Sequence, residues 1–268
     1  MLQLQEASVI DTSLKPYVKG YGLLRLSSTV IREKEILPWP GSFLLFASQA
    51  FELDGQAYPF GCVRQMHDAA SRLRWKGDEL EVFTVRFAPY GLRPFLVGPV
   101  DRLRQRDMET ASVWNVPLPS IYEDMLAATA LNSKVKLVED FLVSTLDPKS
   151  IDSTDDSIMQ LADAIRREPS EPFGPLRERV HLSNRQFARR FKALIGVNLR
   201  TYVRICRFAH AKTSLLLSPT PSLTQLGYEA GYFDQAHFSR DFSALAERSP
   251  KLFPSHYPLH RLISERHD

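Results

Sequence analysis

Residues 182–196, LSNRQFARRFKALIG, place four cationic side chains around a spine of apolar residues. Residues 232–242, YFDQAHFSRDF, repeat the apolar spacing but present mainly groups that donate or accept hydrogen bonds. Guanidinium groups form paired hydrogen bonds with planar acceptors, and amide groups both donate and accept at one edge. The two stretches therefore favour binding of a polyanion that also carries hydrogen-bonding groups.

The first stretch predicts a helix with one buried and one exposed face. Ser183 is a residue type that caps helix N-termini, and Gly196 is a type that ends helices. Apolar residues recur between them at helical spacing, which predicts a stripe that packs against the rest of the protein. The stripe consists of Phe187, Phe191 and Leu194.

A shorter helix precedes this one. Pro175 is suited to the first turn of a helix, and the sequence then reaches His181, where the chain must turn sharply. Histidine is among the non-glycine types that tolerate left-handed backbone. The order of helix, tight turn and second helix with a cationic outer face predicts a helix-turn-helix unit.

Residues 222–242 repeat the same plan. Gly231 supplies the turn and Asp234 the N-cap, while Leu223, Leu226 and Ala230 face inward on the preceding helix. The buried stripe of the second helix consists of Phe238 and Phe242.

The segment between the two units contains no glycine or proline from residue 200 to residue 217. It predicts one continuous helix about 27 Å long, at about 1.5 Å per residue. A stiff connector of this length could hold two recognition helices about one turn of DNA apart, roughly 34 Å. Both helices could then enter successive major grooves on one side of a duplex.

These residues resemble the DNA-binding domain of the AraC/XylS family of bacterial transcription regulators over residues 173–254. The sequence GYFDQAHFSRDF is nearly the signature of that family, and Ser249–Pro250 matches the pair that follows it. The first unit and the connector match more loosely. Their matching residues are Ser183, Phe187, Arg189, Phe191, Gly196, Tyr202, Arg207 and Ala211.

The resemblance implies that the first exposed turns of each recognition helix read the major groove. Arg185 or Arg189 would bond guanine, and Gln235 would bond adenine. Other exposed side chains would contact phosphates, which position the protein without reading sequence. Residues expected to face bases are Arg185, Ala188, Arg189, Gln235, Ala236, His237 and Arg240; those expected to face phosphates are Asn184, Gln186, Lys192 and Ser239.

Several positions depart from the family pattern. Arg177 stands where a small residue usually packs, His181 replaces a turn glycine, and Gly227 takes a position usually held by alanine. Asn198–Leu199 replaces a Ser-Pro pair, and Glu247 occupies a usual glycine position.

The first part of the chain reads as short strands from residue 17 to residue 100, followed by two helices between residues 120 and 146. Residues 147–157, DPKSIDSTDDS, are polar and predict a linker. The fold class is therefore α+β multidomain, with domains at 1–146 and 158–268. Residues 15–146 resemble, in the stretches 14–22, 36–47 and 83–96, the cupin-like sensory domains of some AraC-type regulators.

That resemblance implies an N-terminal cupin-like β-barrel with flanking helices, which precedes an all-α double helix-turn-helix domain. It also implies a small-molecule effector in the N-terminal domain and, for an activator, contact with RNA polymerase. The two helices at 120–146 could form a homodimer or could pack on the barrel, and the sequence leaves both open.

Composition limits the other classes of function. The net charge of +3 is uneven, because residues 171–220 contain ten Lys and Arg against two Asp and Glu. His67 is the single histidine of residues 1–170, so no metal site, cofactor or enzymatic activity is expected. The lack of a secretory signal or a membrane-length apolar run predicts a cytoplasmic protein.

Two alternatives remain. Some DNA-repair methyltransferases carry AraC-type domains, so Cys62 or Cys206 could be a reactive thiol. The basic face could also bind a protein rather than DNA.

Overall fold

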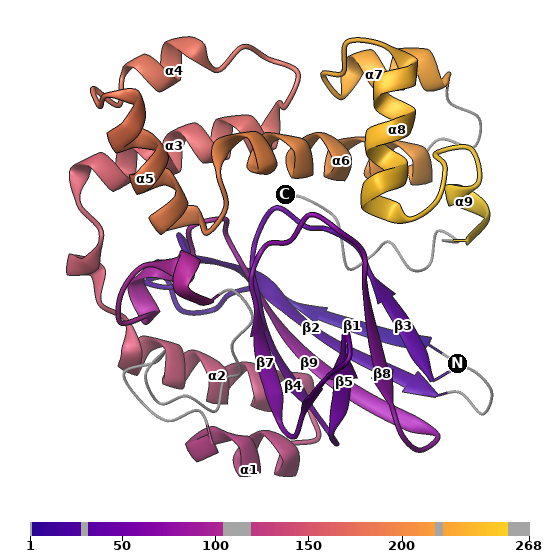
Figure 1. Cartoon of the computed structure of the whole chain (residues 1–268). Helices are drawn as coiled ribbons and strands as arrows, with labels where there is room; N and C mark the ends of the chain where they lie inside the picture. The colour runs from indigo at the N-terminus through magenta and orange to yellow at the C-terminus, as the bar shows by residue number, and fades with distance from the viewer. Residues whose placement is uncertain (1, 28–31, 104–118, 218–221, 257–268) are drawn as a thin grey trace.

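The computed structural model describes residues 2–27, 32–103, 119–217 and 222–256. Within these ranges the strands come first along the chain and the helices follow, and the helices of the C-terminal part lie above the sheets in Figure 1. The strands are β1 (Leu2–Ala7), β2 (Val18–Ser27), β3 (Glu33–Ile36), β4 (Phe43–Ala47), β5 (Phe51–Leu53), β6 (Gln56–Tyr58), β7 (Gly61–Arg64), β8 (Ser71–Trp75) and β9 (Glu79–Phe87). The helices are α1 (Pro119–Ala127), α2 (Leu131–Thr145), α3 (Ser153–Arg167), α4 (Gly174–Glu178), α5 (Asn184–Ile195), α6 (Leu199–Leu217), α7 (Leu223–Glu229), α8 (Gln235–Ala246) and α9 (Phe253–His256).

The strands form two antiparallel sheets, with orders β1-β2-β9-β4-β7 and β3-β8-β5-β6. The β-rich N-terminal part is as predicted. Among the described strands, however, no hydrogen-bonded ladder joins the two sheets, so the closed barrel expected from the sequence is not formed there. Strand β1 extends the first sheet at its edge and pairs with β2 from Leu2↔Leu26 to Ala7↔Tyr21.

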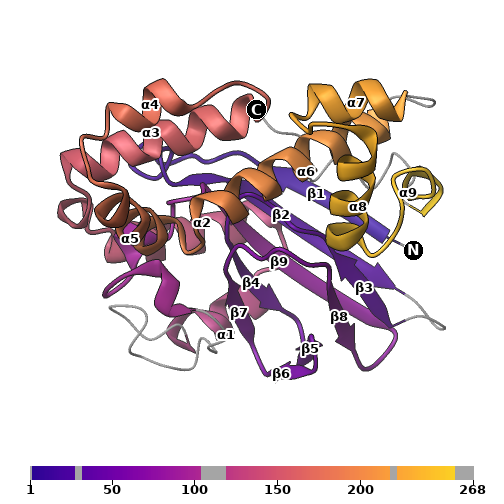
Figure 2. The same ribbon diagram turned by 45° about the horizontal axis from the view of Figure 1, so that its top comes forward.

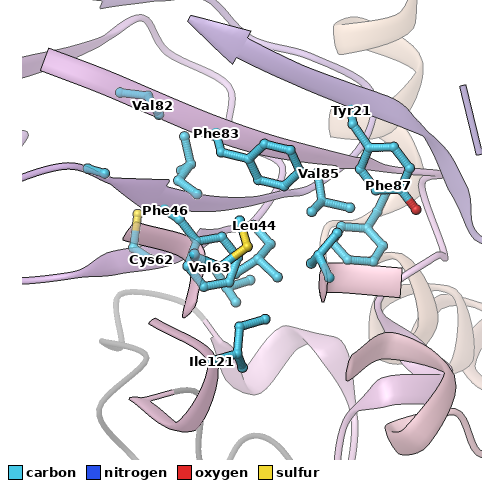
Figure 3. Close-up of a cluster of buried hydrophobic side chains, with 14 of the residues drawn as sticks. Tyr21, Leu44, Phe46, Cys62, Val63, Val82, Phe83, Val85, Phe87 and Ile121 are labelled. Carbon is cyan, nitrogen blue, oxygen red and sulfur yellow. The ribbon is translucent and has the colours of Figure 1, made fainter. Parts of the chain in front are cut away.

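Strand β9 shows why these sequences form a buried sheet. Phe83, Val85 and Phe87 alternate along it and are each at most 2% exposed, as their spacing predicts. Their side chains meet those of β2, β4 and β7 in one cluster, which Ile121 of α1 closes from the other side (Figure 3). This cluster is the core of the N-terminal domain.

Helix α2 packs its apolar stripe onto this core rather than presenting it to solvent. Val138 and Leu142 are fully buried in the cluster. Glu139, on the same helix, accepts hydrogen bonds from the backbone N–H groups of Ile10 and Asp11 and from the Tyr21 hydroxyl, at 2.8–3.0 Å. Of the two arrangements that the sequence left open, packing on the sheet is therefore the one observed for this stripe.

Helix α3 begins at Ser153, inside the segment 147–157 that was predicted as a linker. The polar residues there form the cap and first turn of the helix. The Asp152 side chain accepts from the backbone N–H groups of Thr154 and Asp155, and the Asp155 carboxylate accepts from the Asp152 N–H at 3.4 Å. No helix within the described ranges has the length and apolar composition that a membrane crossing requires.

Candidate nucleic-acid interface

The first helix-turn-helix unit consists of α4, a turn and α5. His181 has left-handed backbone at φ 50°, as the sequence predicts for the turn. Ser183 caps α5 in a capping box with Gln186, and Gly196 ends the helix in left-handed backbone at φ 92°. The predicted stripe is buried: Phe187, Phe191 and Leu194 are 4%, 0% and 2% exposed.

The opposite face of α5 is open to solvent. Arg185, Arg189 and Lys192 are exposed, and no ion pair to them is found among the described residues. Arg190 differs, because its guanidinium pairs with Asp152 and, at 2.8 Å, with Asp155 at the start of α3. Arg190 therefore joins α5 to α3, while the other three cationic side chains of residues 182–196 can contact a partner. The other predicted contacts on this helix, Asn184, Gln186 and Ala188, are also exposed.

Arg177 explains how the first unit tolerates its departure from the family pattern. Its guanidinium lies 3.9 Å from the centre of the Phe187 ring, a cation–π contact. It also donates hydrogen bonds to the Leu182 carbonyl at 3.1 Å and to the Asn184 side chain at 3.2 Å. Arg177 thus fixes the turn and orients Asn184, which sequence reasoning did not foresee.

The second unit consists of α7, a turn and α8. Gly231 has left-handed backbone at φ 84°, and the Asp234 carboxylate accepts from the His237 N–H at 2.7 Å. Phe238 and Phe242 are fully buried. Both the turn and the cap are as predicted.

Gly227 has a packing role that sequence reasoning missed. A Cβ atom at this position would lie 3.2 Å from the Cβ of Phe238, tighter than most contacts of this kind. The missing side chain lets α7 approach α8, which compensates for the low helix propensity of glycine.

The exposed face of α8 carries the predicted contacts. Gln235, Ala236, His237 and Arg240 are exposed, and Ser239 is half-buried. Thr224 on α7 donates a hydrogen bond to Gln235 Oε1 at 2.6 Å, so the Gln235 amide is held in place before any ligand arrives. Thr224 is a second residue that sequence reasoning missed, because the contact bridges two helices.

Helix α6 connects the two units. It is one helix of 19 residues, about 28 Å long. The Asn198 side chain caps α6 by accepting a hydrogen bond from the Thr201 N–H at 2.9 Å. Asn198 therefore supplies a helix cap although the Ser-Pro pair of the family pattern is absent here. Near its start Tyr202 packs on Phe191 of α5, and farther along Phe208 packs on Phe242 of α8. Figures 1 and 2 show α5 and α8 at opposite ends of α6.

The N-terminal domain contacts the C-terminal ends of both recognition helices. Gln65 lies against Gly196 at the end of α5, where a Cβ atom would collide with its amide. At the end of α8, Glu247 has left-handed backbone at φ 53° and pairs with Arg72 of β8. Arg248 pairs with Glu35 of β3 at 3.3 Å. The N-terminal ends of α5 and α8, which carry the predicted base contacts, lie on the side of the helices away from the sheets (Figure 1).

A cleft of about 760 Å³ lies where the two parts meet. It is lined by Tyr58, Arg64 and His67 of the N-terminal domain and by Val197, which follows α5. Arg64 is held there by Asp54 at 3.4 Å. Trp75 and Phe83 are packed in the N-terminal core and do not line this cleft.

The two cysteines lie in different cores. Cys62 and Cys206 are each 1% exposed and are not joined in a disulfide. Burial raises the pKa of the Cys206 thiol to about 12. A thiol in such surroundings is a poor nucleophile, which argues against the alternative of a reactive repair cysteine. Among the described residues, no group of three or more His, Cys, Asp or Glu side chains could hold a metal ion.

Comparison with known proteins bears on the helical part. Residues 176–254 match the family model of a helix-turn-helix domain. No curated protein matches the sequence. Similar solved structures include ToxT from Vibrio cholerae, with 11% identity, a TM-score of 0.48, and coverage of 95% of this chain and 97% of ToxT.

Two further structures are similar to this chain. ToxT has also been solved with a bound unsaturated fatty acid, at 11% identity, a TM-score of 0.45, and coverage of 100% of this chain and 97% of that one. The second is the DNA-binding domain of AdpA in complex with a target DNA, with 21% identity and a TM-score of 0.36. The match covers 40% of this chain and 97% of the AdpA domain. The family match and the two capped helix-turn-helix units agree with the resemblance found in the sequence. Residues 176–254 are an AraC-type helix-turn-helix domain.

Proposed function

We propose that the chain is a sequence-specific regulator of transcription that reads two adjacent major grooves with α5 and α8. One observation carries the proposal: α6 separates two recognition helices whose exposed N-terminal turns are free to meet a duplex. Their C-terminal ends are held on the N-terminal domain. Since recognition helices contact base edges with their first turns, this arrangement leaves the reading ends open.

The side chains divide between reading and positioning. Arg185 or Arg189 bonds the O6 and N7 atoms of guanine in the first half-site, and Gln235 bonds adenine in the second. Ala188 and Ala236 allow close approach to the groove floor, while His237 and Arg240 contact neighbouring base edges. The phosphate contacts are Lys192, Ser239, Asn184 and Gln186, the last through its amide N–H₂ because Gln186 Oε1 serves the cap of α5.

The N-terminal domain, residues 1–146, acts on DNA binding by holding the two recognition helices in a fixed relative position and orientation. The support is that it contacts the end of each helix and therefore cannot move without disturbing both. Preorganised binding surfaces lose less entropy when they bind, so the docked domain favours binding to a site with two half-sites. The cupin-like character of this domain is part of the proposal and is supported by its two antiparallel sheets.

A small-molecule effector would bind in the cleft that Arg64, His67 and Val197 line, because a ligand there touches both domains. Binding of RNA polymerase, formation of a homodimer and a cytoplasmic location belong to the same proposal. The absence of enzymatic activity and of a cofactor is part of the proposal as well. So is a DNA-binding domain at residues 158–268; the start of α3 at Ser153 supports including a few preceding residues.

Selection of duplexes from a random library with the full chain tests the function. The expected result is a consensus of two half-sites whose centres lie about 10 base pairs apart. Affinity for this consensus should fall steeply with salt, with a log–log slope near −0.9 for each phosphate contacted. Failure to enrich any sequence, together with binding that salt does not weaken, would favour the alternative of a protein-binding basic face.

A further inference from the structure

Phe233 is an exposed aromatic residue at the reading end of α8. It directly precedes the N-cap Asp234 and is 84% exposed, more than any other large apolar residue of the described ranges. Burying a phenylalanine side chain is worth roughly 1.5–3 kcal/mol relative to leaving it in water. The folded protein alone gains nothing from this exposure.

The usual structural role of an apolar residue at this position is filled by its neighbour. A residue just before an N-cap often packs on the fourth residue of the helix, which here is Phe238. In this protein Tyr232 makes that contact, with ring centres 5.3 Å apart. The Tyr232 hydroxyl also donates a hydrogen bond to Asp241 at 3.0 Å, so Tyr232 is fixed in the core. Phe233 is left outside it.

The position of Phe233 points to DNA as its partner. The C-terminal end of α8 is held on the N-terminal domain through Glu247 and Arg72, so the opposite end, where Phe233 lies, faces away from it. Gln235 and Ala236, the first two residues of the helix, are exposed beside it. Asp234 lies between Phe233 and Gln235, and its carboxylate accepts a hydrogen bond from the His237 N–H as the helix cap.

The edges of bases in the major groove offer one apolar group, the C5-methyl of thymine, which phenylalanine contacts in other complexes. We propose that Phe233 packs on the methyl group of a thymine in the half-site that α8 reads, and so determines specificity at that position. The proposal rests on the proposed function, since it requires α8 to enter a major groove. It adds a base contact that hydrogen bonding cannot supply.

Deoxyuridine substitution tests this contact, because it removes only the methyl group. The duplex selected by the full chain is prepared with each thymine replaced in turn, and dissociation constants are measured for the wild type and for Phe233→Ala. One replacement in the second half-site should weaken the wild type about fourfold, the effect expected for one buried methyl group. The same replacement should leave the affinity of Phe233→Ala unchanged.

Tyr228→Ala is the matched control. Tyr228 is 58% exposed on α7, so its removal also deletes an exposed aromatic ring of the second unit. This variant should keep the fourfold effect of the methyl group. Circular dichroism and urea unfolding should show Phe233→Ala folded like the wild type, because the ring touches little of the core.

The outcomes separate the two proposals. If no thymine replacement weakens the wild type, or if the same replacement weakens Phe233→Ala equally, the contact of Phe233 with thymine is refuted while DNA recognition stands. If the wild type selects no duplex at all, the proposed function itself fails.

Discussion

Individual residues divide the basic surface into a structural part and a part that can meet DNA. Arg190 of α5 pairs with Asp152 and Asp155 at the start of α3. Arg185, Arg189 and Lys192, also on α5, are exposed. A similar division is seen beside the second unit. Arg204 of α6 pairs with Asp241 of α8, whereas the contact found for Arg240 among the described residues is with the Ala236 carbonyl, at 3.3 Å. Counting charges along the sequence cannot make this distinction, since it depends on which helix packs beside each arginine.

Separate replacement of Arg240 and Lys192 distinguishes a contact with a base from a contact with a phosphate. Arg240→Ala should relax base preference at one position of the second half-site, by about tenfold for a bidentate contact. Lys192→Ala should weaken all sequences about equally and reduce the salt slope by about 0.9. Profiles of binding across randomised duplexes measure both, and an Arg240→Ala profile identical to that of the wild type would contradict the base contact.

The cysteines should be unreactive in the folded protein. Burial raises the pKa of the Cys206 thiol to about 12, so little thiolate forms at pH 8, and Cys62 is equally buried. Iodoacetamide at pH 8 should therefore modify neither residue until urea unfolds the chain, as mass spectrometry would show. Rapid native alkylation of Cys206, or its methylation by alkylated DNA, would revive the repair alternative.

The sequence predicted the exposed residues better than their partners. Ten of the eleven residues predicted to contact DNA are exposed on α5 and α8, and Ser239 is half-buried, because helical spacing separates buried from exposed positions. Their contacts with DNA stay predictions. Thr224 beside Gln235, and Arg177 over Phe187, could not be predicted in this way. Both contacts join side chains of different helices, whose relative placement one sequence does not reveal.

At the scale of elements, caps and turns were predictable because they depend on a few neighbouring residues. Ser183, Gly196, Gly231 and Asp234 all have the expected roles. Part of the predicted linker 147–157 forms the cap and first turn of α3, because the polar residues of a capped first turn have the composition of a linker. The domain boundary itself stays a prediction. Strand β1 was not predicted, although Leu2 and Leu4 alternate with Gln3 and Gln5, a spacing that favours a strand.

The cap of α8 gives a prediction at this scale. Asp234→Ala removes the acceptor of the His237 N–H and should lower the free energy of unfolding by about 1 kcal/mol. Asp234→Asn keeps an acceptor and should cost only a few tenths. Urea denaturation measures both changes. Equal stabilities of the two variants would show that the cap contributes little to α8.

At the scale of the whole molecule, the N-terminal domain and the ends of the recognition helices form one structure. Glu247 and Arg248 are consecutive, and their partners Arg72 and Glu35 lie opposite each other on paired strands. Glu247 has left-handed backbone, which a glycine would adopt without strain. Compared with glycine, the glutamate destabilises this conformation by about 1–2 kcal/mol. The sequence marked Glu247 as unusual, but its partner lies 175 positions away along the chain.

Breaking the ion pair between Arg72 and Glu247 should weaken binding to a duplex with both half-sites and leave binding to a single half-site unchanged. Arg72→Ala should weaken the two-half-site duplex by up to about fivefold, since an exposed ion pair contributes at most about 1 kcal/mol. Affinity for a duplex with one half-site should not change. Arg74→Ala is the control, because Arg74 of the same strand pairs with Glu33 and Glu52 inside the N-terminal domain. Tighter binding by Arg72→Ala would mean that the docked domain opposes DNA binding.

Two recognition helices at opposite ends of the rigid α6 must read half-sites on the same side of a duplex, and changing the spacing of the half-sites tests this most directly. Inserting about 5 base pairs turns the second half-site to the far side of the DNA. The dissociation constant of the full chain should then rise to that of a duplex carrying one half-site. Unchanged affinity after the insertion would contradict simultaneous reading of two grooves by α5 and α8.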